Sequence, residues 1–173
     1  MKRIICVIAV LVLGFALSGC GSTPDSPTPA PAPVRFTAAL LASNEVPPVT
    51  NENAGASGTA TITFNLTRDA AGTIVSGTAD FTASLSGFPN GSALTGAHIH
   101  PGASGVNGGV LISTAIAAGE VSFPAGSGTL TKTGIALTAE QANSIMANPA
   151  GFYFNVHTAT SPGGAARGQL VRQ

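Results

Sequence analysis

The sequence has little charge, few aromatic residues and almost no cysteine. Charged residues make up 8% of its 173 residues, tryptophan is absent and there is a single tyrosine. From Cys20 onward it has five Lys and Arg against seven Asp and Glu, so it lacks the basic surface that nucleic-acid binding requires. No cysteine follows Cys20, which excludes a disulfide in the rest of the chain. A domain built from this chain must be stabilised by its hydrophobic core or by a bound ion.

The first nineteen residues have the layout of a secretory signal. Lys2 and Arg3 precede a mostly apolar run over residues 4–16, which is shorter than the roughly 20 residues that a membrane-spanning helix needs. Leu17-Ser18-Gly19-Cys20 resembles the lipobox of bacterial lipoproteins, which implies cleavage before Cys20 and attachment of membrane lipid to its thiol. Gly21, in place of an aspartate, favours the outer membrane or cell surface. An ordinary signal peptide with a chance cysteine is the alternative.

The segment after the cleavage point is predicted to be a tether. Prolines alternate with other residues over positions 27–33, which disfavours both helix and sheet and gives a semi-extended chain of about 3.1 Å per residue. The sequence therefore predicts three parts in the cell envelope: a signal peptide (1–19), a lipidated cysteine with a Pro-rich tether (20–34) and a folded domain (35–173).

The folded domain is predicted to be an all-β, antiparallel Greek-key β-sandwich of about eight strands with one short helix. Apolar and polar residues alternate over residues 58–67, where Ala60, Ile62 and Phe64 share one face. Residues 137–147 instead have helical spacing, and Thr138 with Gln141 forms a capping box. The expected strands are residues 35–42, 58–67, 73–86, 93–100, 110–116, 127–132, 152–158 and 167–172.

The three histidines of the domain fall into two short motifs. His98 and His100 flank Ile99 at the end of a predicted strand, so both imidazoles lie on one face, and His157 lies near the end of another strand. If these strands are neighbours, three imidazoles converge around an open position, which is typical of zinc and copper sites. Alternatively, His98 and His100 bond backbone groups and stiffen residues 101–109, and His157 caps a strand end.

Other catalytic and binding patterns are weaker. Asp80 lies in the middle of a predicted strand and no Gly-x-Ser-x-Gly motif occurs, which argues against a Ser-His-Asp hydrolase. Asn44, Glu45 and residues 51–53 offer loop oxygens for calcium, but they lack the regular acidic spacing of a dedicated calcium loop. We therefore expect a binding protein rather than an enzyme.

Several motifs occur in a fixed order along the predicted domain. They are Glu45-Val46-Pro47-Pro48, Ala97-His98-Ile99-His100, Asn107-Gly108-Gly109-Val110, Tyr153-Phe154-Asn155-Val156-His157-Thr158 and Gly164-Ala165-Ala166-Arg167-Gly168-Gln169-Leu170. Together they resemble the CHRD domain, a family first described in chordin and common in bacterial exported proteins. The resemblance covers residues 35–172 and implies a fold and an exported location more than a chemical activity. Ala165 and Ala166 depart from the acidic residue that many members have there.

The histidine pattern also has a weaker likeness to copper-zinc superoxide dismutases. That likeness implies copper ligation by His98, His100 and His157 and an anion contact at Arg167, although the bridging histidine, the zinc ligands and the disulfide pair of those enzymes are missing. Arg167 can equally be structural, bonding loop carbonyls or Glu45. Three hypotheses follow: an anchored module that binds copper or zinc through the three histidines, a metal-free scaffolding module with an envelope protein partner, and a dismutase-like redox enzyme.

Overall fold

Alternating hydroxyl and apolar side chains form the longest strands of the computed structural model, which describes residues 32–173. These strands are β2 (Ser57–Arg68), β3 (Ile74–Ser86) and β7 (Gly128–Thr138). In the central part of β2 and β3 every second side chain is buried, as the period of two in the sequence predicts. In β7 only Leu130 and Leu137 are buried. The predicted signal peptide, Cys20 and most of the predicted tether lie outside the described residues.

Shorter elements complete the domain, and several of them begin and end within one residue of the predicted bounds. Residues 32–173 lie within one compact unit. Its remaining elements are β1 (Val34–Leu41), η1 (Ala42–Asn44), β4 (Ser92–Pro101), β5 (Ile112–Ser113), β6 (Ser122–Phe123), α1 (Ala139–Ala147), η2 (Pro149–Gly151), β8 (Phe152–Thr158), β9 (Ala166–Gln169) and β10 (Val171–Arg172).

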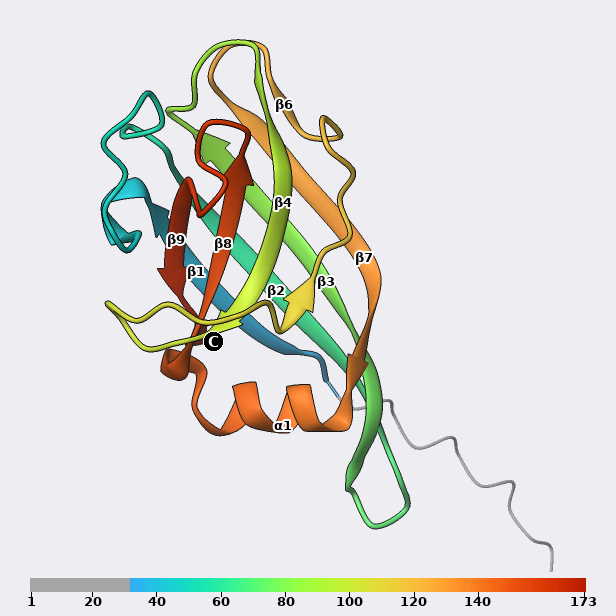
Figure 1. The fold of residues 1–173 in the computed structure, drawn as a ribbon. Coiled ribbons are helices and arrows are strands. Elements are labelled where there is room, and N and C mark those ends of the chain that lie inside the picture. Colours follow the sequence, from blue (N-terminus) through green and yellow to red (C-terminus); the bar gives the residue numbers. More distant parts are fainter. Residues whose placement is uncertain (1–31) are drawn as a thin grey trace, which may run out of the picture. The chain divides into compact units, whose positions relative to one another are not determined.

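The strands of residues 32–173 pair in one antiparallel sheet of ten strands. Its order is β5-β4-β8-β9-β1-β2-β3-β7, while β10 pairs with β1 and β6 with β4. Figure 1 shows β4, β8 and β9 lying across β1, β2, β3 and β7, so the sheet curls over itself into two facing walls. The predicted all-β antiparallel class with one short helix is confirmed. The two walls are continuous because Leu41 of β1 pairs with Arg167 of β9, and the result is a nearly closed barrel.

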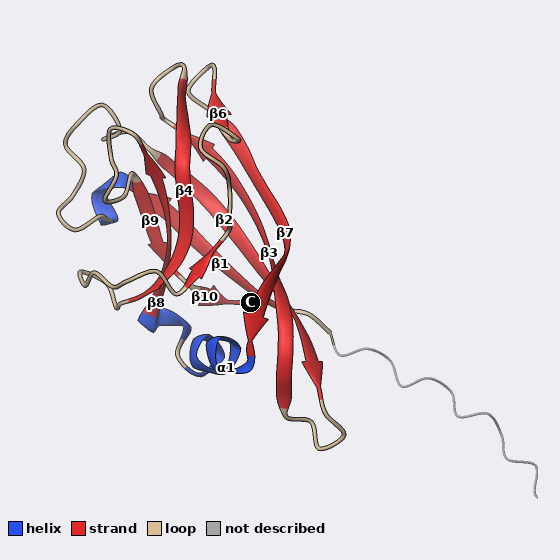
Figure 2. Cartoon of the chain, turned by 45° about the vertical axis from the view of Figure 1, so that its right-hand side comes forward, coloured by secondary structure: helices blue, strands red, loops and turns tan. Residues whose placement is uncertain are grey.

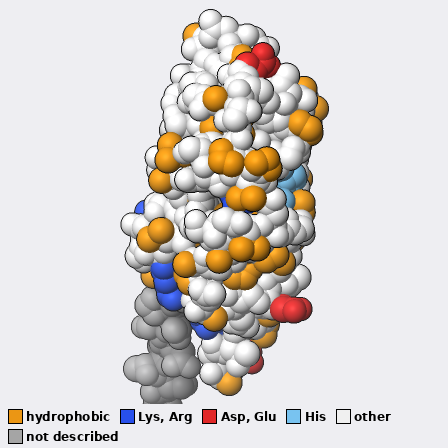
Figure 3. All heavy atoms as spheres, turned by 60° about the vertical axis from the view of Figure 1, so that its left-hand side comes forward, with side chains coloured by type: hydrophobic (Ala, Val, Ile, Leu, Met, Phe, Trp, Pro, Cys, Tyr) orange, Lys and Arg blue, Asp and Glu red, His pale blue; other side chains and the backbone are white. Residues whose placement is uncertain are grey.

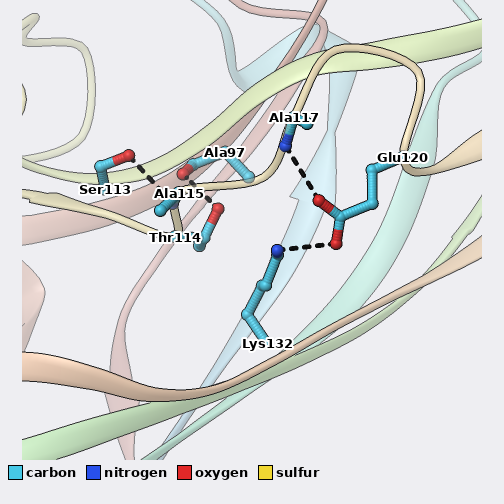
Figure 4. Close-up of polar contacts among 7 residues, drawn as sticks. All are labelled: Ala97, Ser113, Thr114, Ala115, Ala117, Glu120 and Lys132. Atoms are coloured by element: carbon cyan, nitrogen blue, oxygen red, sulfur yellow. Dashed lines mark hydrogen bonds and ion pairs between the residues drawn. The ribbon is translucent and has the colours of Figure 1, made fainter.

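An ion pair joins β7, at one end of this sheet, to the loop after β5, at the other end. The Lys132 ammonium on β7 lies 2.7 Å from a carboxylate oxygen of Glu120, in the loop that follows β5 (Figure 4). The same carboxylate accepts a hydrogen bond of 2.9 Å from the backbone amide of Ala117. Because both charged side chains are partly in contact with solvent, screening by water weakens this ion pair.

The hydrophobic core fills the space between the two walls. The rings of Phe81 on β3 and Phe154 on β8 lie 5.8 Å apart, which joins one wall to the other. Helix α1 lies at one end of the barrel and buries Ala142 and Ile145 against it (Figure 2). The predicted capping box of Thr138 is present and begins this helix. Among the described residues, no helix is both long and apolar enough to cross a membrane.

Two strand predictions need correction. The strand expected over residues 110–116 is only Ile112–Ser113, and Ala115 shortly after it has a φ of 54°, which extended backbone does not adopt. Strand β7, expected to end at Lys132, continues to Thr138 through a bulge at which the register shifts. Gly134 provides the left-handed backbone that this bulge requires, with a φ of 70°. In the sequence, this bulge is visible only as a break in the alternation of apolar and polar residues.

Candidate metal centre

Pairing between β4 and β8 brings the three histidines together. His98 lies opposite Asn155, and Gly96 lies opposite His157. Because alternate residues of β4 share a face, His100 lies on the same side as His98. One ring nitrogen from each of the three histidines falls within 4.8 Å of the others. The strands that contain the histidines are therefore neighbours, which is the condition that the sequence set for the three imidazoles to converge.

The imidazole rings approach one another closely enough to share one ion. The Nδ1 atom of His98 and the Nε2 atom of His157 are 3.1 Å apart. The ring centroids lie 5.6 Å apart for His98 and His100, 4.9 Å for His98 and His157, and 6.0 Å for His100 and His157. The three rings therefore form a compact triangle across the two strands.

Backbone carbonyls fix the hydrogen positions on two of the rings. Nδ1 of His100 lies 3.1 Å from the carbonyl oxygen of Gly108, and Nδ1 of His157 lies 3.0 Å from that of Pro162. A carbonyl oxygen only accepts hydrogen bonds, so each Nδ1 atom carries the hydrogen and each Nε2 atom keeps a lone pair. Within residues 32–173, the buried Nε2 atom of His100 has no hydrogen-bond partner. This is the ligating form of an imidazole whose other nitrogen is held in place.

Burial keeps all three imidazoles neutral at physiological pH. Burial, together with the nearby His157 and His100, lowers the pKa of His98 to about 4. Burial also lowers the pKa of His100 and of His157, although the carbonyls that accept their Nδ1 hydrogens oppose this. Since a neutral imidazole is the form that binds a metal ion, the site is prepared for ligation without losing a proton.

A stack of side chains holds the His100 ring from behind. The Tyr153 ring lies nearly parallel to it, at 7° and 5.0 Å between centroids. The guanidinium carbon of Arg167 lies 4.4 Å from the Tyr153 ring centroid, in a cation–π contact. The Tyr153 hydroxyl also accepts a hydrogen bond from the backbone amide of Gly108. Gly108 therefore forms hydrogen bonds with both His100 and Tyr153.

Arg167 lies inside the protein, with 1% of its surface exposed. Its Nε donates to the carbonyl of Asn44 at 2.7 Å, and one terminal nitrogen donates to Asn107 Oδ1 at 2.7 Å and to the carbonyl of Val106 at 3.4 Å. Two of these three partners are backbone carbonyls, and among residues 32–173 Arg167 forms no ion pair with Glu45. Its other terminal nitrogen is buried without a partner among residues 32–173. The guanidinium therefore joins the loop before Glu45 to the loop that holds His100.

Glu45 is 5% exposed and is not part of the histidine cluster. Both of its carboxylate oxygens accept from the amide nitrogen of Asn155, at 3.1 and 3.3 Å. In the described part of the chain no lysine or arginine lies within ion-pair distance of this carboxylate. Burial raises the pKa of Glu45 to about 7, although the charge of Arg167 opposes that rise. Glu45 is therefore outside the histidine cluster but connected to it through β8.

The histidine cluster is open to solvent on one side. His100 is 6% exposed, whereas His98 and His157 are partly exposed. Figure 3 shows histidine atoms at the surface among hydrophobic and uncharged neighbours. An ion held by the three nitrogens would thus retain access for a fourth ligand such as water.

Some contributors to this site were missed by the sequence interpretation. A Cβ atom on Gly96 would lie 2.9 Å from Cε1 of His98, so the missing side chain makes room for the ring. The stacking of Tyr153 on the His100 ring was likewise not predicted. Gly96 lies two residues before His98, and this spacing would have indicated its role only once β8 was known to be the partner strand.

The other oxygen-rich candidates have internal partners. The side chain of Asp80 accepts from Asn65 Nδ2 and from the backbone amide of Gly134, each at 2.8 Å. The Asn51 side-chain oxygen accepts from the amide of Asn53 and from the Ser161 hydroxyl. These groups hold turns and loops together.

Comparison with known proteins shows the family of this domain. The family model described as the CHRD domain matches residues 36–170, which includes all three histidines, Glu45 and Arg167. No curated protein matches the chain.

Proposed function

Since the chain belongs to the CHRD domain family, we propose that its domain is an extracytoplasmic binding module that holds one copper or zinc ion between His98, His100 and His157. The observation that carries this proposal is the orientation of two rings. Carbonyls of Gly108 and Pro162 hold the Nδ1 hydrogens of His100 and His157, which leaves both Nε2 lone pairs for the ion.

The distances support an ion of this kind. Two nitrogen ligands of a tetrahedral zinc ion lie about 3.3 Å apart when each bond is about 2.0 Å long. The observed separation of 3.1 Å between His98 Nδ1 and His157 Nε2 is close to that value. Neutral imidazoles suit both zinc and copper, and three of them leave a position for water.

A metal-free binding or scaffolding module is the second candidate, and one contact favours it. His98 Nδ1 can donate its hydrogen directly to His157 Nε2, so this pair is satisfied without an ion. The buried Nε2 atom of His100, which lacks any partner in the described residues, favours the metal proposal instead. A buried lone pair left without a partner costs about 1–3 kcal/mol, which an ion would offset.

Calorimetric titration separates these two candidates. The chain from residue 22 onward is titrated with Zn²⁺ and with Cu²⁺, beside a variant in which His98, His100 and His157 are all replaced by alanine. We expect one ion per chain with a Kd below about 1 μM, and loss of that binding in the variant. Glu52→Gln, which removes an exposed carboxylate elsewhere, is the control and should bind as the original chain does. Equal binding by the triple variant, or a Kd above about 1 μM for the original chain, would favour the metal-free module instead.

We further propose that lipid on Cys20 anchors the module to the cell envelope. Support comes from the resemblance of Leu17-Ser18-Gly19-Cys20 to a lipobox. Expression in a bacterium with radiolabelled palmitate, followed by fractionation of membrane and soluble protein, tests this anchor. We expect label and membrane association in the original chain, and neither in Cys20→Ser. Membrane association that persists without label would refute the proposal.

A further inference from the structure

A pocket of about 350 Å³ lies beside Glu45 and is separate from the histidine cluster. Its apolar side is formed by the segment that follows Glu45, which includes Pro47 and Pro48. Its polar side is formed by residues of two loops, Asn107 and Ser161 among them. The pocket thus combines one carboxylate with apolar walls.

The Glu45 carboxylate has unused capacity to accept hydrogen bonds. A carboxylate has about four lone-pair positions, and the amide nitrogen of Asn155 offers two hydrogens. The charge of Arg167 acts on this carboxylate, but the guanidinium donates to the neutral oxygens of Asn44, Val106 and Asn107. The negative charge therefore lacks a direct counter-ion.

Several contacts hold the pocket in its shape without a ligand. Asn107 Nδ2 donates to the carbonyl of Val46 at 2.8 Å, and Asn51 Nδ2 donates to the Ser161 hydroxyl at 3.0 Å. Gly164 leaves space at the carboxylate, because a Cβ atom there would lie 2.5 Å from a Glu45 oxygen. A preformed pocket binds a ligand without a large ordering cost.

We propose that this pocket binds a primary ammonium group at the end of an alkyl chain, with Glu45 as its counter-ion. The methylene groups of such a ligand would pack on Pro47 and Pro48, as lysine stems do on apolar surfaces. A lysine side chain of a protein partner and a free alkylamine share this chemistry.

The hydrogen-bond pattern favours an ammonium over a guanidinium group. Asn155 Nδ2 approaches both carboxylate oxygens of Glu45, so the two parallel bonds that an arginine fork prefers are obstructed. An ammonium group acts as a compact charge and needs only one free position. The pKa of Glu45, raised to about 7 by burial, is consistent with a carboxylate that lacks a cation.

Titration with n-butylammonium at pH 8, followed by ¹H–¹⁵N NMR of the chain from residue 22 onward, tests the proposal. We expect shift changes in residues 46–50 and 161–164, with a Kd on the order of 1 mM for so small a ligand. Butanol, which has the same alkyl chain and no charge, should bind at least about tenfold more weakly. Titration with N-acetyl-lysine methylamide distinguishes the two sources: binding of both ammonium compounds favours a protein lysine, and binding of butylammonium alone favours a free amine.

Substitutions of two glutamates make the test specific. Glu45→Gln keeps the shape and removes the charge, and should weaken butylammonium binding by at least about tenfold. Glu52→Gln, at an exposed position, should leave it unchanged. Butanol binding equal to that of butylammonium, equal binding in Glu45→Gln, or no shift in the pocket would overturn the proposal. The triple histidine variant should still bind butylammonium, so this result is independent of metal binding.

Discussion

The Nδ1 atom of His98 lies 3.1 Å from the Nε2 atom of His157, although 59 positions separate the two residues in the sequence. The rings meet because Gly96, two residues before His98, is the partner of His157 in the β4–β8 ladder. The same separation suits a hydrogen bond in the free protein and two ligands of one ion. Metal binding would therefore replace a shared hydrogen with little movement of the rings.

Metal binding should stabilise the fold. An ion that binds only the folded chain adds about 2.7 kcal/mol to the free energy of unfolding at a concentration 100 times its Kd. For a domain of this size we expect Tm to rise by roughly 8 °C in thermal denaturation followed by circular dichroism. The triple histidine-to-alanine variant should show no rise, and an equal rise in that variant would point to binding elsewhere.

Gly96→Ala should weaken metal binding while the domain stays folded. The added methyl group would lie 2.9 Å from Cε1 of His98, so the ring must turn away from the position in which it faces His157. We expect the Kd for Zn²⁺ to rise at least about tenfold in calorimetry, a loss of about 1.4 kcal/mol. Gly163→Ala is the matched control, because a Cβ atom there meets nothing within 4 Å. Unchanged affinity in Gly96→Ala would mean that His98 does not ligate the ion.

Glu45→Gln should stabilise the protein above neutral pH. Burial raises the pKa of Glu45 from 4.5 to about 7 in the folded chain, so the folded state keeps a proton that the unfolded state loses. Its contribution to stability is therefore fully present below pH 4.5 and is lost as the pH rises to about 7. The difference in free energy of unfolding between Glu45→Gln and the original chain should grow by about 3 kcal/mol from pH 4.5 to pH 8.

Urea denaturation at a series of pH values measures this difference. The three histidines titrate in both proteins, so their contributions cancel when the two curves are subtracted. Both curves are recorded with a chelator present, so that metal does not contribute. A difference that does not vary with pH would show that Glu45 has an ordinary pKa.

Asn53→Ala should destabilise the domain by about 2 kcal/mol, because buried hydrogen bonds are lost. Asn53 is fully buried, and its Nδ2 atom lies 2.8–3.0 Å from the hydroxyls of Thr158, Thr160 and Ser161. Asn65→Ala is the control, since its hydrogen bond to Asp80 is exposed and its loss should cost less than about 0.5 kcal/mol. The midpoints of urea denaturation compare the two, and equal losses would contradict the prediction.

Local patterns of the sequence were sufficient for much of the fold. The alternation in residues 58–67 predicted most of β2, and the capping box at Thr138 predicted where α1 begins, to within two residues. The placement of His98 and His100 on one face also follows from alternation alone. These features depend on neighbours a few residues apart, which a single sequence contains.

Other features depend on long-range pairing, which a single sequence does not contain. The convergence of His157 with His98 requires β8 beside β4, although β5, β6 and β7 lie between them in the chain. The carbonyls of Gly108 and Pro162 belong to loops whose path has no periodic pattern. Likewise, Glu45 meets Asn155 because β9 pairs with both β1 and β8, so its raised pKa could not be predicted from residue type.

The division of the ligands between β4 and β8 has a consequence for the order of events during folding. In the unfolded chain only His98 and His100 are close enough in sequence to bind one ion together. His157, the third ligand, joins them when β8 pairs with β4. The conformational entropy of closing that long loop is lost through strand pairing and core packing, not through the ion. Tight metal binding would therefore follow the pairing of these two strands in time, and the rate at which a refolding chain acquires tight affinity for metal would measure how fast that pairing forms.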